Sequence, residues 1–402
     1  MAESFFADSL DRFDPLDAKQ GIPHAGLAAL RAERPVHRTP GGVFYLALQE
    51  DVLAATRAVE TFRANFREPG VVVPPEEMLI NEIPEPRHGR IRKIVNSAVA
   101  AHRLSRVESV LRELAAELLE RALAQGGGEL VRELVMPIPT SVIAHLLGVP
   151  PEDWALWARW SDEVVQGDYP SRNRTARGEG LAGGHPEFAA YIDAEIARRR
   201  RMADPPDDFM TRLLRTEVDG VRLSDVEART LVAFLLVSGN ETTRHLLGNL
   251  IHTMAAQPEV FAALRADRGL VSNAVEESLR FEPPVAVLMR ECCLDTSVRG
   301  VAIPRGSRVA FGVASANRDE RCYADPDVFR LDRRDPKAHV GFGGGPHVCP
   351  GAALARLEGR VLLELFAERV AEIRLPPGFR REKVPVFWAE GPVALPAELV
   401  RA

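Results

Sequence analysis

The sequence predicts a mainly α-helical fold with a small β region. The longest helical pattern runs from Asp225 to Met254, and its segment LVAFLLV is apolar on every face, as expected of a helix that crosses the core. Residues 104–124 also follow a helical period. After Pro284, the segments SVRGVAIP and SRVAFGV are instead typical of short strands, with turns at Gly300 and Gly306. A strand-like VFYLAL lies near the N-terminus, at residues 43–48.

The composition narrows the class of protein. The 402 residues are 46% hydrophobic and 27% charged, which is typical of a globular chain. The formal net charge is -6, whereas a general nucleic-acid binder is normally basic. The four cysteines have neither metal-site spacing nor the pattern of a secreted disulfide framework. The sequence also lacks a signal peptide and any apolar run of the roughly 20 residues that span a bilayer. We therefore expect a cytoplasmic protein with no membrane anchor and no nucleic-acid partner.

The stretch VGFGGGPHVCPGAALARLEGR, residues 340–360, places Cys349 between a glycine-rich loop and a helix. The glycines allow the backbone to approach a flat ligand closely. After Pro350 the apolar residues recur at three- and four-residue intervals, so Cys349 lies just before a helix N-terminus. The unsatisfied amides of such a terminus favour an anion, and we expect the pKa of the thiol to fall there. A lone cysteine is more often inert packing, so its surroundings must decide its role.

Five residues around this cysteine fit the pattern F-x-x-G-x-H-x-C-x-G: Phe342, Gly345, His347, Cys349 and Gly351. In this pattern the chain resembles the cytochrome P450 family of haem-thiolate enzymes. In that family the matching cysteine is the axial thiolate of the haem iron, which favours O–O cleavage. The resemblance implies haem b, iron protoporphyrin IX, with Cys349 as the metal ligand. Pro350 stands where many relatives carry leucine, and proline fits a first helical turn.

A basic helix in RHGRIRKIVNSAVA carries His88 and Arg92 four residues apart, on one side. Alone, such a cluster is usually a solvated helix face. The family carries an H-x-x-x-R pair on the equivalent helix, where it binds the haem propionates, and buried carboxylates need cationic donors. The resemblance thus implies that His88, Arg92, His347 and Arg290 bind the propionates. It places four further residues against the haem: Phe342, Gly343, Gly351 and Gly239.

Polar residues interrupt the apolar central helix from Ser238 to Thr243. A glycine inside a helix costs ~1 kcal/mol relative to alanine, and a buried unpaired acid costs more. A threonine within a helix often only bonds back to an upstream carbonyl. The run from Gly239 to Thr242 nevertheless resembles the oxygen-activation motif of the family. The resemblance implies that Thr242 lies beside the activated oxygen and that Glu241 relays protons, although Ser238 stands where alanine or glycine is usual.

Glu277 and Arg280 lie three residues apart on one predicted helix. Taken alone, they are an ordinary helical ion pair. In the family an E-x-x-R pair locks the core together with an arginine from a later loop. Arg333 and Phe329 in DPDVFRLDR match that loop. The resemblance therefore implies a structural network of Glu277, Arg280 and Arg333.

The resemblance extends from about residue 40 to the C-terminus and implies one cytochrome P450 domain over residues 1–402, with a long central helix over the haem. Its β-containing part is expected at about 40–65 and 285–402, and its helical part at about 85–284 and 350–370. The implied activity is a monooxygenase that activates dioxygen and hydroxylates a lipophilic small molecule. Alternatives are a peroxide-driven peroxygenase and a non-catalytic haem binder or sensor. Neither accounts for Glu241 and Thr242 together.

The sequence contains no flavin or nicotinamide motif, so the electrons are expected from a ferredoxin and a ferredoxin reductase. We expect a monomer that docks the ferredoxin through Arg87, Arg90, Lys93 and Arg356 near the cysteine. The substrate, such as a terpenoid, steroid, branched lipid or natural-product intermediate, is expected between the central helix and the loops at 68–84 and 165–187. The predicted lining is apolar: Val71, Val72, Val73, Met78, Leu79, Phe234, Val237, Val285, Val287, Leu288 and Phe387.

Overall fold

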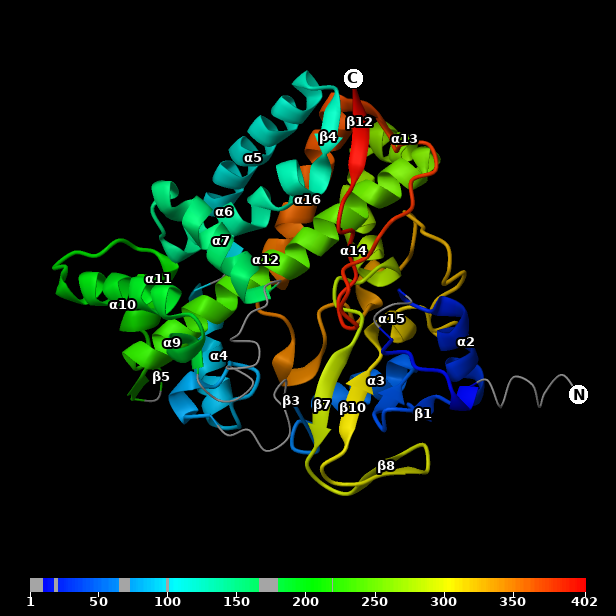
Figure 1. Ribbon diagram of the computed structural model, residues 1–402, viewed down its shortest axis with the longest axis horizontal. Helices are drawn as coiled ribbons and strands as arrows, with labels where there is room; N and C mark the ends of the chain where they lie inside the picture. The colour runs from blue at the N-terminus through cyan, green and yellow to red at the C-terminus, as the bar shows by residue number, and fades with distance from the viewer. Residues whose placement is uncertain (1–9, 18–20, 65–72, 99–100, 166–179, 219) are drawn as a thin grey trace, which may run out of the picture.

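The computed structural model describes residues 10–17, 21–64, 73–98, 101–165, 180–218 and 220–402. Helix α12, Asp225–Ala256, runs diagonally across the molecule, and the other elements are arranged around it (Figure 1). The Ser224 hydroxyl accepts a hydrogen bond from the Glu227 amide at 3.2 Å, and the Glu227 carboxylate accepts one from the Ser224 amide at 2.7 Å. This reciprocal cap fixes where the helix begins. The long helix predicted over residues 225–254 is therefore confirmed.

Helices make up most of the molecule around α12. The larger ones are α4 (Arg87–Ala98), α5 (Ala101–Ala124), α6 (Pro137–Leu147), α7 (Trp154–Val165), α10 (Pro186–Arg201), α13 (Pro258–Ala266), α14 (Val271–Phe281) and α16 (Ala352–Arg369). The shorter ones are α2 (His24–Glu33), α3 (Gln49–Arg57), α9 (Gly180–Gly184), α11 (Phe209–Arg215) and α15 (Val313–Ala316). Single turns lie at Pro75–Glu77, Val131–Val135, Pro151–Asp153, Arg268–Leu270, Pro336–Ala338 and Gly345–His347.

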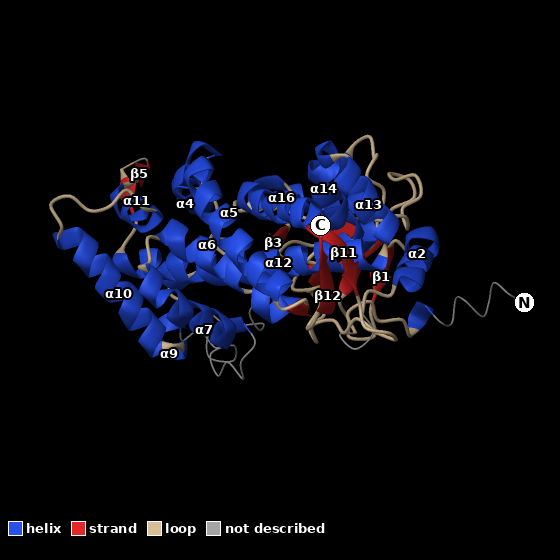
Figure 2. Ribbon diagram, turned by 90° about the horizontal axis from the view of Figure 1, so that it is seen from above, coloured by secondary structure: helices blue, strands red, loops and turns tan. Residues whose placement is uncertain are grey.

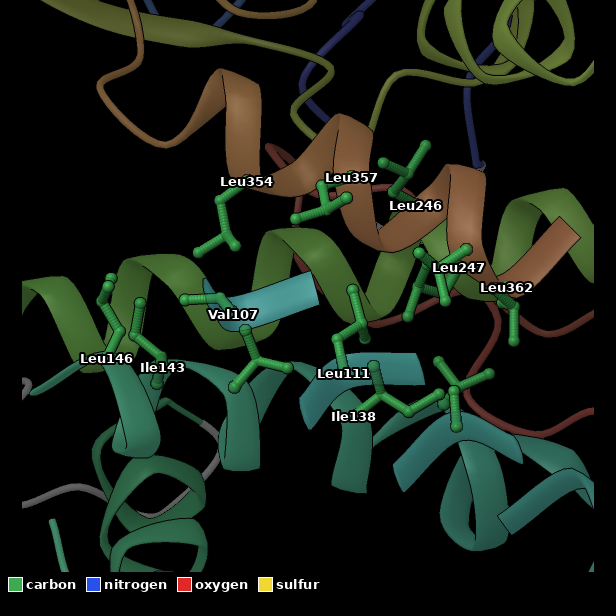
Figure 3. Close-up of a cluster of buried hydrophobic side chains, with 14 of the residues drawn as sticks. Val107, Leu111, Ile138, Ile143, Leu146, Leu246, Leu247, Leu354, Leu357 and Leu362 are labelled. Carbon is green, nitrogen blue, oxygen red and sulfur yellow. The ribbon is translucent and has the colours of Figure 1, made fainter. Parts of the chain in front are cut away.

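Apolar side chains from α5, α6, α12 and α16 meet around the middle of α12 (Figure 3). The labelled members are Val107, Leu111, Ile138, Ile143, Leu146, Leu246, Leu247, Leu354, Leu357 and Leu362. Fully burying one aliphatic side chain of this size stabilises the fold by ~1.5–3 kcal/mol. The cluster therefore holds α16, which follows Cys349, in a fixed position against α12.

A five-stranded sheet packs beside the helices, in the order β1 (Val36–Arg38), β2 (Phe44–Leu46), β10 (Arg308–Phe311), β7 (Leu288–Cys292) and β3 (Phe62–Ala64). β2 and β10 are parallel, and the other neighbours are antiparallel. Successive side chains of a strand point to opposite faces, so Leu288 and Arg290 share one face of β7. The strands predicted within VFYLAL and SRVAFGV are confirmed.

A second sheet has the order β11 (Val370–Arg374), β12 (Pro396–Arg401) and β4 (Gly127–Glu129). Two hairpins join β5 (Glu217–Val218) to β6 (Val221–Arg222) and β8 (Thr296–Val298) to β9 (Val301–Ile303). β4, β5 and β6 lie within the range that we expected to be helical. β4 depends on a distant partner, because a Cβ at Gly127 would lie 2.1 Å from the Ala397 carbonyl oxygen of β12. No local period could reveal such a strand.

The two kinds of structure separate in space. Seen from above, β1, β11 and β12 lie toward the side of α2, and α7, α9 and α10 lie toward the opposite end (Figure 2). Within the residues described, no helix combines the length and apolarity that crossing a bilayer requires.

Candidate functional site

One cavity brings together most of the predicted site residues. It lies between α12 and the loop that precedes α16, and α4 and β7 also contribute to its walls. Its lining includes His88, Arg92, Gly239, Thr242, Arg290, Phe342, Gly343, His347, Cys349 and Gly351. These residues come from segments far apart in the chain, so the fold itself assembles the site.

The loop before Cys349 is closed by its own backbone. The Cys349 amide donates a hydrogen bond to the Phe342 carbonyl at 2.9 Å. Gly343 and Gly345 have φ angles of +73° and +61°, a region that side chains disfavour. A Cβ at Gly345 would also lie 2.3 Å from the Thr56 carbonyl oxygen of α3. The glycines predicted to allow a close approach therefore allow the loop to turn tightly against α3.

Cys349 lies just before the first residue of α16, and its accessible surface faces the cavity. Burial raises the pKa of its thiol, and the amides of Gly351 and Ala352 and the guanidinium groups of Arg92 and Arg356 oppose this shift only in part. The expectation that the pKa falls was therefore wrong for the protein alone, because desolvation outweighs the helix N-terminus. A coordinated metal ion deprotonates a thiol outright, so the raised pKa is compatible with metal ligation.

Two histidines form part of a basic end of the cavity. The ring centroids of His88 and His347 lie 4.3 Å apart, and His88 Nδ1 lies 2.9 Å from Glu85 Oε1. Burial and the charges of His88, Arg290 and Arg92 lower the pKa of His347 to about 4. His88 Nε2 and His347 Nδ1 are buried without a hydrogen-bond partner in the described part of the chain. The site thus holds two polar nitrogens that the protein itself does not satisfy.

Two guanidinium groups complete this basic end. Arg290 donates to the Met289 carbonyl at 2.8 Å and lies over the Phe311 ring, and among the described residues it forms no ion pair with a carboxylate. Burial lowers the pKa of Arg290 to about 10. Arg92 is half-buried and donates to the Val348 carbonyl. A buried cation is normally paired with an anion, and here the fold does not supply one for Arg290.

The donor set fits a flat cofactor that carries carboxylates. Cys349 offers a sulfur ligand to the cavity, while the unpartnered imidazole nitrogens and the unpaired Arg290 offer hydrogen bonds at its basic end. Charge-assisted hydrogen bonds from such donors to carboxylates are stronger than neutral ones. In the described residues there is no cluster of three or more His, Cys, Asp or Glu side chains that could hold a metal ion by themselves. The residues therefore fit a thiolate-ligated metal held within an organic cofactor.

One face of α12 forms part of the cavity wall, which is lined there by Phe234, Leu235, Ser238, Gly239, Thr242, Thr243 and Leu246. The Ser238 hydroxyl donates to the Phe234 carbonyl at 2.6 Å, and the Thr242 hydroxyl donates to the Ser238 carbonyl at 2.8 Å. Both side chains therefore bond back to their own helix and keep lone pairs that can accept. A Cβ at Gly239 would lie 3.0 Å from Ile143 Cδ1, so this glycine permits the close packing of α12 on α6.

Glu241 does not line the cavity, although its neighbour Thr242 does. Successive helical residues are rotated by about 100°, so adjacent positions face different surroundings. The Glu241 side chain is buried, and its Oε1 lies 3.7 Å from Arg244 Nη2 and 3.6 Å from His245 Nε2. The two residues predicted to act together thus lie on neighbouring faces of α12.

Some of the residues predicted to line the substrate pocket line this cavity, and others do not. Phe234, Val285 and Leu288 line the cavity, whereas Val71 and Val72 lie outside the described residues. Val73, Met78, Leu79, Val237, Val287 and Phe387 are not part of the lining. Val237 lies four residues before Glu241 and shares its face of α12. Val287 points to the opposite side from Leu288 and packs with Met289, in the apolar cluster that Phe387 also contacts.

Sequence reasoning missed several residues of the apolar wall: Ile80, Ile143, Leu146, Leu147, Phe209, Leu246 and Leu279. Those of α6 and α11 belong to apolar helix faces, and periodicity does not separate a core position from one that lines a cavity. Asn81 was also missed. It lines the cavity, and its side-chain oxygen is buried without a hydrogen-bond partner.

The predicted network around Glu277 is formed. Both carboxylate oxygens of Glu277 accept hydrogen bonds at 2.8 Å from Arg280, and Arg333 donates at 2.8 and 3.0 Å. Burial alone would raise the pKa of Glu277, but these hydrogen bonds outweigh it and lower the pKa. Glu277 and Arg280 are fully buried, so the network ties α14 to the later loop inside the core.

Two of the four predicted docking cations are used within the fold. Arg87 pairs with Glu227 in the first turn of α12 and donates to the Pro75 carbonyl at 3.0 Å. Arg356 donates to Glu276 at 2.6 and 3.0 Å and lies over the Phe342 ring. Arg87 thus turns toward α12, and the charge of Arg356 is balanced by Glu276. The positive charge that the predicted cluster offers to a partner protein is therefore smaller than the sequence suggested.

Comparison with known proteins gives a consistent result. The family model described as Cytochrome P450 matches residues 185–369. The chain is 36% identical to the erythromycin C-12 hydroxylase of Saccharopolyspora erythraea, over 86% of this chain and 87% of that protein. It is 38% identical to the vitamin D(3) 25-hydroxylase of Pseudonocardia autotrophica, over 86% of each. Its fold is similar to that of a cytochrome P450 from Chondromyces apiculatus, with a TM-score of 0.86 and 33% identity over 98% of this chain and 99% of that one.

Proposed function

The chain belongs to the cytochrome P450 family of haem-thiolate monooxygenases, and on that premise we propose that it hydroxylates a lipophilic small molecule held between α12 and the haem. The observation that carries this proposal is the single cavity, which has a cysteine and a basic end on one side and an apolar wall with Thr242 on the other. This arrangement offers a place for the cofactor, for oxygen and for a hydrocarbon substrate in one cavity.

We propose that the cofactor is haem b and that the sulfur of Cys349 would bind its iron. When bound, the haem supplies oxygen activation, which a thiolate ligand favours. Residues of the cavity lining would hold it: His88, Arg92, Arg290 and His347 would bind the propionates, and Phe342, Gly343 and Gly351 would lie against the ring. A propionate would then give Arg290 the carboxylate partner that it lacks among the described residues. His88 Nε2 and His347 Nδ1 would also gain hydrogen bonds.

Thr242 and Glu241 are proposed to control protons at the oxygen site. The Thr242 hydroxyl already donates to the Ser238 carbonyl, so its lone pairs are free to accept from a water molecule in the cavity. Glu241, behind it on the helix, can supply the proton that such a water molecule passes on. This division of roles fits the positions of the two side chains, since only Thr242 faces the cavity.

The substrate is proposed to be mainly hydrocarbon, such as a terpenoid, a steroid, a branched lipid or a natural-product intermediate. The wall of aliphatic and phenyl groups gains ~25 cal/mol for each Å2 of apolar surface that a ligand removes from water. Among the described residues, the charged side chains of the lining lie at the basic end, where the cofactor is proposed to bind, so these residues offer no anchor for an acid at the substrate end. Asn81 offers an amide to a hydroxyl or carbonyl group. The names of the relatives, which concern a macrolide and vitamin D3, support this class.

We propose that a ferredoxin and a ferredoxin reductase supply the electrons. We further propose that the enzyme is a monomer and lies in the cytoplasm. The exposed Lys93 of α4 is the cleanest site for a test, because reversal of Arg356 would also break its pair with Glu276. We expect Lys93→Glu to raise the KM for ferredoxin and to weaken its dependence on ionic strength. An unchanged KM at low and high salt would contradict docking at this helix.

A carbon monoxide difference spectrum of the reduced protein, followed by titration with a ligand panel, tests the main proposal. The panel contains terpenoids, steroids, vitamin D3, fatty acids and small aromatic acids, and the readout is the spin shift of the haem. We expect a thiolate-type spectrum and spin shifts with the lipophilic ligands. Shifts confined to the small aromatic acids would rule out the proposed substrate class.

The two alternative functions give different turnover results. A peroxygenase would form product with hydrogen peroxide at least as fast as with ferredoxin and reductant, and a sensor would bind ligand without forming product. The proposed monooxygenase forms product with dioxygen and ferredoxin.

A further inference from the structure

The face of α12 that carries Glu241 is covered by the C-terminal loop. Glu241, His245 and Asn249 follow one another at four-residue intervals, so they share one face of the helix, and none of them lines the cavity. The loop reaches this face at Gly391, where a Cβ would lie only 2.1 Å from His245 Nδ1. Glycine is therefore required for the loop to close over the His245 ring.

His245 is buried, with 1% of its surface exposed, and both of its ring nitrogens are without a hydrogen-bond partner in the described part of the chain. Its Nε2 lies 3.6 Å from Glu241 Oε1, just beyond hydrogen-bond length. Buried imidazole nitrogens are normally satisfied, so this exception needs an explanation. A small movement of the Glu241 side chain, or one water molecule, would complete the contact.

The charged groups that face His245 come from two elements. Burial lowers the pKa of His245, Glu241 opposes this, and Arg244 of α12 and Arg381 of the C-terminal segment lower it further. The ring is therefore neutral at neutral pH. A neutral imidazole has one N–H donor and one acceptor nitrogen on opposite sides, so it can take a proton on one side and release one on the other.

A cluster of ionisable groups lies beyond the ring. Arg381 Nη2 lies 3.1 Å from Glu390 Oε1, and Arg381 Nη1 lies 2.6 Å from Glu282 Oε2. Arg381 Nη2 also donates a hydrogen bond to Asn249 Oδ1 at 2.7 Å. Glu390, the residue before Gly391, keeps its other carboxylate oxygen buried and without a hydrogen-bond partner among the residues that the structure describes. Burial raises the pKa of Glu390, so this carboxyl group holds a proton more readily than an exposed one. Nδ1 of His245 thus faces the loop that carries Glu390, and Nε2 faces Glu241.

We propose that His245 is a positioning residue that orients Glu241 and returns protons to it from the Arg381–Glu390 side of α12. The Glu390 carboxyl group gives a proton toward Nδ1, the proton at Nε2 leaves to the Glu241 carboxylate, and the ring ends neutral in its other tautomer. The net result is the transfer of one proton from Glu390 to Glu241, and no electrons change hands. The inference rests on the proposed role of Glu241 and adds the route by which that carboxylate is reprotonated without passing through the substrate cavity.

A spectroscopic test needs no turnover. The 15N signals of labelled histidines are recorded in the diamagnetic ferrous carbon monoxide form, and His245 is assigned from the signals lost in His245→Asn. We expect Glu241→Gln to shift the ring signals of His245 and to change its tautomer ratio. Ring signals that stay unchanged in Glu241→Gln would show that the two side chains do not communicate and would overturn the proposal.

A kinetic test separates a proton role from a packing role. We expect His245→Phe to lower product per electron pair by about tenfold, a modest loss for one proton-transfer group, and to enlarge the solvent isotope effect. The Kd from ligand spin shifts should not change, because His245 does not line the cavity. Turnover with iodosylbenzene, which supplies an oxygen atom without protons, should be retained. Loss of both activities alike would mean that the ring only packs.

Three further variants complete the design. His145→Phe, on the neighbouring α6, is the matched control and should keep its coupling. Gly391→Ala should reproduce the uncoupling of His245→Phe, because its Cβ displaces the ring. The double variant of Glu241→Gln and His245→Phe should be no worse than Glu241→Gln alone. If Glu241→Gln itself remains coupled, the proposed role of Glu241 fails; if it uncouples while His245→Phe does not, only this inference fails.

Discussion

Cys349 shows how one side chain can be unsuited to its proposed role until its ligand is bound. Burial raises the pKa of its thiol, while two amides at the start of α16 and two arginines lower it. The same amides are directed at the sulfur whether or not it is charged, so they are ready to stabilise a thiolate once a metal ion removes the proton. The surroundings thus select a ligand rather than a free reactive thiol.

The first prediction concerns this residue. Cys349→Ala should abolish the thiolate-type carbon monoxide band of the reduced protein, because no other cysteine of the chain lines the cavity. The measurement is the difference spectrum of variant and parent at equal haem content. Cys322→Ala, which changes an exposed cysteine, is the control and should keep the band. Persistence of the band in Cys349→Ala would refute the assignment.

Thr242 carries the second prediction. Thr242→Ala removes the polar side chain through which a water molecule could be ordered at the cavity wall, so reductant should be consumed with less product and more hydrogen peroxide. We expect product per electron pair to fall by at least about tenfold. Thr253→Ala, a buried threonine of the same helix outside the cavity, should remain coupled. Equal coupling in the two variants would leave Thr242 as a helix residue only.

Motifs with fixed spacing made most of the site predictable. His88, Arg92, His347 and Cys349 were recognisable because each belongs to a short pattern in which the chemistry fixes the residue types. Leu146 was not recognisable in this way, because an aliphatic residue on a helix gives the same sequence pattern whether it faces the core or a cavity. Glu241 and Thr242 point in different directions because they are adjacent on a helix. Which of the two faces the cavity depends on how α12 is rotated about its axis, and only the packed structure determines that rotation.

At the scale of elements, helices α14 and α16 are joined by a contact that the sequence did not reveal. Glu276 of α14 accepts hydrogen bonds from Arg356 of α16 and lies 2.9 Å from His339 Nε2, and its neighbour Glu277 binds Arg280 and Arg333. Adjacent acids of one helix thus connect to two different segments. The spacing E-x-x-R predicted the pair of Glu277 and Arg280, and the family resemblance added Arg333, 56 residues away. No motif indicated the partners of Glu276, which lie 63 and 80 residues away.

The third prediction follows from the pKa of Glu276. Burial alone would raise it, but the hydrogen bonds of His339 and Arg356 outweigh burial and lower it from 4.5 to about 2. The carboxylate therefore stabilises the fold above pH 4.5, and this contribution is lost as the pH falls toward 2. With solvent screening included, the loss is roughly 2 kcal/mol.

Urea unfolding between pH 5 and pH 2.5 tests this dependence of stability on the ionisation of Glu276, because the stabilisation is expected to be lost within that pH range. The gap in unfolding free energy between the parent and Glu276→Gln should be largest at the upper end and should shrink as the pH falls. Glu60→Gln, at an exposed position, should show no such gap. A gap that stays constant with pH would mean that the ionisation of Glu276 does not contribute.

At the scale of the whole molecule, we expect the stability of the fold to depend on whether a ligand occupies the cavity. α12 and α16 are fixed by the apolar cluster between them, whereas the basic end of the cavity collects buried polar groups that have no internal partner. Hydrophobic periodicity predicted both helices and the burial of α12, although it did not predict their packing on each other. The second could not be derived from local sequence, because it is the assembled fold that leaves Arg290 without a carboxylate partner among the described residues. Binding of a ligand that satisfies these groups stabilises the folded state by mass action.

The last prediction uses Arg290, whose removal should have opposite effects on the protein with and without its cofactor. Without haem, Arg290→Met replaces a buried cation that lacks a carboxylate partner by an apolar side chain, and we expect the apoprotein to gain about 1–3 kcal/mol of unfolding free energy. With haem, the same change removes a propionate ligand, and haem affinity should fall by about tenfold or more. Urea unfolding of the apoprotein and haem transfer to apomyoglobin measure the two effects. Arg305→Met, at an exposed arginine, should change neither. An apoprotein that is destabilised by Arg290→Met would show that the guanidinium already has sufficient partners within the fold, and the proposed propionate role would lose its main physical support.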